Sequence, residues 1–137
     1  MVFIWLLVGL LAAWGFVCFA CSKPAELERR IMAIGLIVAG LIYCLFAIWY
    51  WQPYWLGIEI IAILVNIGLI FLSFKHSIYW LVFAWAIHPF WDLYIHLIGP
   101  ANFFTPSWYP VFCLSFDLFV AVVIVRRQLS WQKLNQE

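Results

Sequence analysis

The chain has 137 residues, of which 69% are hydrophobic and only 9% are charged, and its formal net charge is +1. A soluble domain is roughly half apolar and a quarter charged, so this composition excludes an ordinary soluble fold. The basic residues are few and scattered, which argues against nucleic acid as a partner because they cannot follow a phosphate backbone.

Five apolar runs follow one another along the chain, and a span needs about 20 such residues. Backbone in lipid must satisfy its own hydrogen bonds, so runs of this length are predicted to be helices. We expect one all-α domain over residues 1–137, a polytopic transmembrane helix bundle of about five spans. The expected spans are 2–20, 30–51, 54–74, 77–98 and 109–125. The first run lacks a basic flank and a small-residue cleavage site, which favours a retained span over a signal peptide.

The basic residues indicate how the chain crosses the membrane. If the spans alternate, the break after the first span, the break after the third span and the C-terminal tail lie on one side. These segments hold every basic residue, namely Lys23, Arg29, Arg30, Lys75, Arg126, Arg127 and Lys133. The positive-inside rule makes that side cytoplasmic, so we expect the N-terminus outside and the C-terminus inside.

Three carboxylates fall inside the predicted spans, where ionisable groups are costly and are functional candidates by default. Glu59, Asp92 and Asp117 each lie about 8–12 Å below the outer end of their span, at about 1.5 Å per residue. His88, Asp92 and His96 follow at four-residue intervals, which keeps them on one stripe of a helix. We expect Glu59, Asp92, His96 and Asp117 to converge inside the bundle.

No lysine or arginine lies at the depth of these acids. The acids must therefore take up protons or bind a cation, and imidazole with carboxylate suits a divalent metal such as zinc, iron or manganese. His88 and His96 are about 12 Å apart along a regular helix, so both cannot easily bind one ion. The expected metal ligands are His96, Asp92, Asp117 and Glu59, with His88 as a proton relay. A kink at Pro89 would alter this arrangement.

Each polar residue also has a simpler interpretation. A single one in a span is commonly a contact between helices, which applies to Asn66 or His88 taken alone. The Cys18-x-x-Cys21 pair is more typical of small filler residues than of redox chemistry. Most of the abundant aromatic residues are expected to form an interfacial belt. As a minority alternative, Trp55, Trp91 and Tyr94, with Trp85, line a pocket for a flat lipophilic molecule.

The stretch His88-Pro-Phe-Trp-Asp92-Leu-Tyr-Ile-His96, followed by Cys113 and Asp117, resembles a pattern in small uncharacterised bacterial integral membrane proteins. These proteins are classed as a domain of unknown function, and the similarity covers roughly the C-terminal third. It implies a bacterial inner or plasma membrane and no assigned activity. The alternation of histidines and acids is also similar to that of intramembrane hydrolases and lipid-modifying enzymes that hold a metal, although those are larger and have more histidines.

Three functions fit these features, and whether the protein is an enzyme stays open. The first is an intramembrane enzyme or ligand-binding protein that acts on a lipophilic substrate by isomerisation, cyclisation or hydrolysis. Its candidate acid–base residues are Asp92, Asp117, Glu59 and His88. The second is a cation or proton transporter or channel subunit, for which a homo-oligomer would have to complete the polar path. The third is a non-catalytic membrane assembly subunit. We rank the first ahead, with membrane lipids as surroundings.

Overall fold

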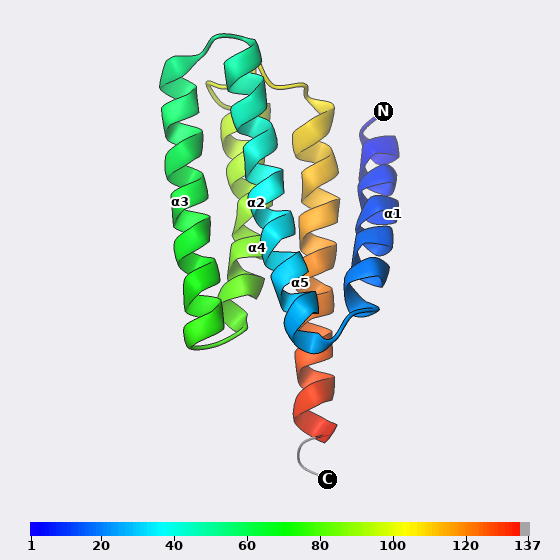
Figure 1. Cartoon of the computed structure of the whole chain (residues 1–137). Coiled ribbons are helices and arrows are strands. Elements are labelled where there is room, and N and C mark those ends of the chain that lie inside the picture. The colour runs from blue at the N-terminus through cyan, green and yellow to red at the C-terminus, as the bar shows by residue number, and fades with distance from the viewer. Residues whose placement is uncertain (135–137) are drawn as a thin grey trace.

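The computed structural model describes residues 1–134, with side chains described to residue 129. It is a bundle of helices, which confirms the predicted all-α fold (Figure 1). The helices are α1 Val2–Cys21, α2 Ala25–Trp49, α3 Pro53–Lys75, α4 Tyr79–Asp92 and α5 Trp108–Leu134, and a π-helix, η1 Leu93–Leu97, continues α4.

The helix lengths identify an integral membrane protein. Four helices, α1, α2, α3 and α5, are long and apolar enough to cross a membrane. The fourth predicted span is divided into the 14-residue α4 and the five-residue η1. Together these two form a continuous rod of nearly the length that a span needs, about 20 residues. Large apolar side chains such as Leu11, Ile34 and Ile61 are exposed around the bundle, as lipid contact requires.

Two helix ends differ from the sequence prediction by five residues or more. α2 begins at Ala25, five residues early, because Pro24 provides a φ of −54° at its N-cap and needs no N–H partner there. Glu26 and Glu28 in its first turn also favour an early start, since carboxylates stabilise a helix N-terminus. α5 runs to Leu134 because no glycine or proline follows Pro110, and its end projects beyond the bundle (Figure 1).

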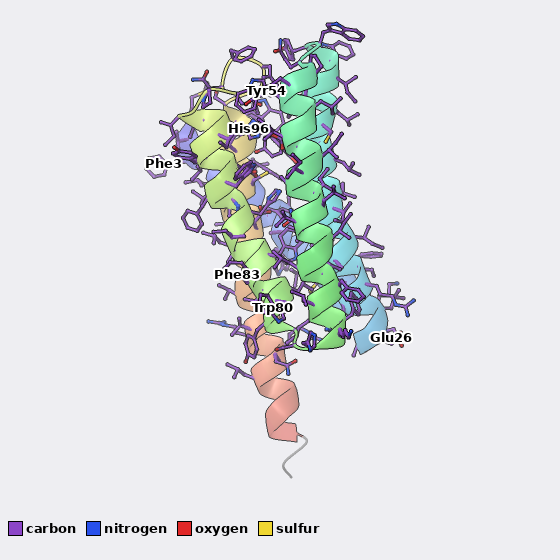
Figure 2. All side chains as sticks on the ribbon, turned by 90° about the vertical axis from the view of Figure 1, so that its left-hand side faces the viewer. Phe3, Glu26, Tyr54, Trp80, Phe83 and His96 are labelled. Atoms are coloured by element: carbon purple, nitrogen blue, oxygen red, sulfur yellow. The ribbon has the colours of Figure 1, made fainter. Side chains whose placement is uncertain are left out.

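The packing order places the functional side chains. α5 lies between α1 and α4, α3 packs against α4, and α2 packs against α3. Gly9 allows the close approach of α1, since a Cβ there would collide with Ser115 and the Phe112 carbonyl of α5. His96 lies near the end of the bundle that carries Tyr54, whereas Glu26 marks the opposite end (Figure 2).

Candidate functional site

Two adjacent helices bring one histidine and two carboxylates together in the bundle interior. His88 and Asp92 are one turn apart on α4, and Asp117 faces them from α5. The Nδ1 atom of His88 lies 2.9 Å from Oδ2 of Asp117 and 3.4 Å from Oδ2 of Asp92. One ligand atom of each residue lies within 4.8 Å of the others, and all three side chains are buried. We call these three residues the triad.

The triad leaves several polar atoms without a partner. Among the described residues, Oδ1 of Asp117 accepts no hydrogen bond. The Asp92 carboxylate has the Tyr43 hydroxyl and Nδ1 of His88 near it, neither in full hydrogen-bond geometry. The Nδ1 atom of His88 carries at most one proton, so it cannot donate a strong bond to both carboxylates. No described lysine or arginine forms an ion pair with either acid. The site therefore has unused capacity to accept a proton or to bind a cation.

A second acid–histidine pair lies nearer the 98–107 connection. The Nε2 atom of His96 is 2.9 Å from Oε1 of Glu59 on α3, and its Nδ1 is 3.0 Å from the Thr105 hydroxyl. The His96 ring also stacks on Tyr43 of α2, with ring centroids 4.1 Å apart. Each ring nitrogen of His96 thus has one polar neighbour, whereas Nδ1 of His88 lies near two carboxylates.

The placement of the histidines differs from the sequence expectation. Asp92 and Asp117 lie together, but His88 accompanies them, whereas His96 pairs with Glu59. The cause is the π-helix: the amide of Ile98 bonds to the carbonyl of Leu93, five residues back, which widens the last turn and changes the direction of His96. Pro89, which lacks an N–H, weakens the helix just before this change.

A groove between α3 and α4 reaches the triad from the outside of the bundle. Its volume is about 510 Å³, and it is lined by Ile58, Ile61, Ala62, Val65, Asn66, Ile87, His88 and Trp91. The walls are apolar except for Asn66 and His88, which are 6% and 5% exposed. His88 therefore has two environments, because one ring nitrogen contacts the buried acids while the residue lines a groove open to lipid.

The four aromatic residues proposed as pocket walls lie in different surroundings. Trp91 lines the groove. Trp55 instead packs against Phe104, with ring centroids 6.3 Å apart, and Tyr94 is 69% exposed. Trp85 is fully buried in the core beside Phe16 and Phe116.

Sequence reasoning missed three buried residues with polar groups. Tyr43 is fully buried, and its hydroxyl lies beside the Asp92 carboxylate without full hydrogen-bond geometry. Thr105 binds His96 from a connecting segment, where a lone threonine carries no sequence signal. Glu28 is buried at the opposite end of the bundle, where Arg127 binds it. It lies in the polar segment that precedes the second predicted span.

The sequence also matches a known protein family. The model of a family of unknown function, DUF6010, matches residues 4–129. The chain belongs to this family. The match to DUF6010 includes part or all of every helix, well beyond the C-terminal third that carried the sequence resemblance, and it fits the expectation of an uncharacterised domain. No curated protein and no solved structure matches the chain. Membership of DUF6010 therefore assigns no reaction, and functional argument must start from the triad and the groove.

Proposed function

We propose that this protein binds a lipophilic small molecule in the α3–α4 groove and transfers protons to and from it through His88. The observation that carries the proposal is that His88 lines the groove while its Nδ1 contacts both buried carboxylates. A proton on Nδ1, donated to Asp117, leaves Nε2 as the basic nitrogen. Nε2 makes no hydrogen bond to any described residue, and it lies 4.0 Å from the point where a Cβ on Gly40 of α2 would stand. The absence of a side chain at Gly40 leaves room beside Nε2 for a ligand atom.

The surroundings of His88 favour isomerisation or cyclisation over hydrolysis. The two carboxylates stabilise the imidazolium that forms when His88 accepts a proton from a substrate carbon. A proton delivered from His88 to a different carbon completes an isomerisation that needs no other reactant. Exchange of the imidazolium proton with solvent before delivery puts a solvent proton on that carbon. Hydrolysis would require water in a groove whose walls are almost entirely apolar. Between the triad and the α1–α2 connection, the bundle interior is filled by buried apolar residues such as Leu81, Trp85 and Ile124. These residues leave no polar path for an ion in the described part of the chain, so a transporter is a less favoured function than an enzyme.

A divalent metal ion at the triad is the second candidate. Neighbouring ligands about 2.0–2.1 Å from one ion lie roughly 2.8–3.4 Å from each other in octahedral or tetrahedral geometry. Nδ1 of His88 is 2.9 Å and 3.4 Å from the two Oδ2 atoms. An ion would also engage the unpartnered oxygens of Asp92 and Asp117. These distances favour His88 over His96 and Glu59 as ligands. Elemental analysis should then find about one metal ion per wild-type chain and none in Asp117→Asn.

The proposed topology places the triad in the outer half of the plasma membrane, with the N-terminus outside and the C-terminus in the cytoplasm. It rests on the basic residues, which gather toward the end of the bundle opposite the exposed Asn102. A cysteine at Asn102 should react with an impermeant maleimide added to intact cells, and a reporter fused to the C-terminus should be active in the cytoplasm. The opposite pattern would reverse the topology.

Deuterium exchange tests the proton transfer directly. The purified protein is incubated in D₂O with the apolar lipid extract of the cells that express it, and deuterium bound to carbon is measured by mass spectrometry. We expect wild-type protein and Ile67→Leu, an exposed α3 residue outside the groove, to label one lipid class, and His88→Gln to label none. Equal labelling by His88→Gln would overturn the proposal.

A further inference from the structure

We propose that the α3–α4 groove selects lipophilic molecules that carry a hydroxyl or carbonyl oxygen, and that Asn66 recognises this oxygen. The inference rests on one part of the proposed function, namely that the groove is a binding site. It adds the chemical class of the ligand and a residue that determines specificity.

The evidence is the unpaired carboxamide of Asn66. Asn66 is only 6% exposed, and it lines the groove. Its side chain makes no hydrogen bond to any described residue. A carboxamide offers two donor hydrogens and one acceptor oxygen. Burying such a group in an apolar wall is unfavourable unless a partner arrives, and the groove is the side from which one can come.

The groove chemistry excludes other ligand classes. A plain acyl chain presents only carbon and hydrogen, so it would leave the Asn66 amide unpaired. A charged head group is disfavoured because the lining contains no lysine, arginine or carboxylate. A neutral oxygen satisfies the amide without bringing a charge into the bilayer.

The shape of the groove limits the ligand to one small molecule. The α3 residues that line it run from Ile58 to Asn66, about 12 Å along the helix. The volume of about 510 Å³ falls in the usual range for small-molecule sites, roughly 300–1,000 Å³. Trp91 provides a flat wall opposite branched aliphatic side chains, which suits an unsaturated chain or ring. Because His88 shares this groove, an oxygen held by Asn66 would bring nearby carbon atoms within reach of the imidazole.

The test uses three probes with the same isoprenoid carbon skeleton: farnesol, farnesal and farnesene. Binding to the full-length protein in detergent is measured by competition against a fluorescent lipid. Wild-type protein should bind the alcohol or the aldehyde roughly two- to tenfold more tightly than the hydrocarbon, the contribution of one hydrogen bond. Asn66→Leu should bind all three alike, while Asn66→Ser, which keeps a hydroxyl, should retain part of the preference. Ile67→Leu should behave as wild type.

The outcomes separate this inference from the proposed function. Equal binding of all three probes by the wild-type protein, or an unchanged preference in Asn66→Leu, would overturn the role of Asn66. His88→Gln should keep the preference for oxygenated probes even though it loses deuterium labelling, since recognition and proton transfer lie on different residues. Failure of every probe to bind would overturn both the inference and the groove as a binding site. Melting curves of each variant establish that it is folded.

Discussion

The two ends of the bundle bury carboxylates in opposite ways. At one end Glu28, 3% exposed, accepts a hydrogen bond from Nη2 of Arg127 at 2.8 Å, and its other oxygen lies 2.5 Å from Nε in an ion pair. In the other half, Asp92 and Asp117 share a single histidine, and no arginine or lysine of the described residues pairs with them. The three acids are similarly buried, but Glu28 has a permanent cation beside both of its oxygens and the two aspartates do not. The comparison separates a structural ion pair from a site with unused binding capacity.

The Glu28–Arg127 pair also holds helices together at one end of the bundle. It connects α2 to α5 across 99 residues of sequence, and the thiol of Cys21 at the end of α1 lies 3.4 Å from the same carboxylate. Three helices are therefore held at one point near the α1–α2 connection. The triad connects only α4 and α5, which already pack closely.

The largest effect on stability should come from breaking the structural pair. Arg127→Met leaves a buried carboxylate without its cation, and we expect a loss of about 2–3 kcal/mol in unfolding free energy. This is below the roughly 3–5 kcal/mol for a fully buried pair because the Arg127 side chain is 35% exposed. Chemical unfolding in detergent measures the change.

Arg30→Met is the matched control, because Arg30 pairs with Glu26 on the exposed surface of α2. Its cost should stay below about 0.5 kcal/mol. Equal effects of the two substitutions would mean that the buried pair is no more important than a surface pair, and the contrast between the two ends would disappear.

An intermediate effect is expected at the second acid–histidine pair. His96→Phe keeps a flat ring against Tyr43 but removes both polar contacts, to Glu59 and to Thr105. We expect a loss of about 1–2 kcal/mol, because Glu59 loses its partner but can still take up a proton. Adding Glu59→Gln to His96→Phe should recover part of this loss. A larger loss in the double variant would show that the two residues do not act as a pair.

Hydropathy predicted the helices because a membrane-spanning helix must be apolar over its whole length, and the acids stood out for the same reason. The sequence did not indicate that His88 would lie beside Asp92 and Asp117 while His96 pairs with Glu59. The π-helix η1 changes the turn of the helix after Asp92, and its only sequence signal is Pro89 one turn earlier. The groove was equally inaccessible to sequence reasoning. α3 is apolar on nearly every face, so its sequence does not determine which face turns toward α4.

The smallest effect on stability, with the largest effect on function, is expected at Asp92. Asp92→Asn keeps the size of the side chain and removes a carboxylate that has no fixed cation, so the unfolding free energy should change by less than about 1 kcal/mol. The same substitution removes a group that stabilises the imidazolium of His88 or binds a metal, so deuterium labelling or metal content should fall to background. Asp117→Asn should behave alike. If both variants keep full activity, metal content and thermal stability, the triad is a structural contact between α4 and α5, and the proposed function falls with it.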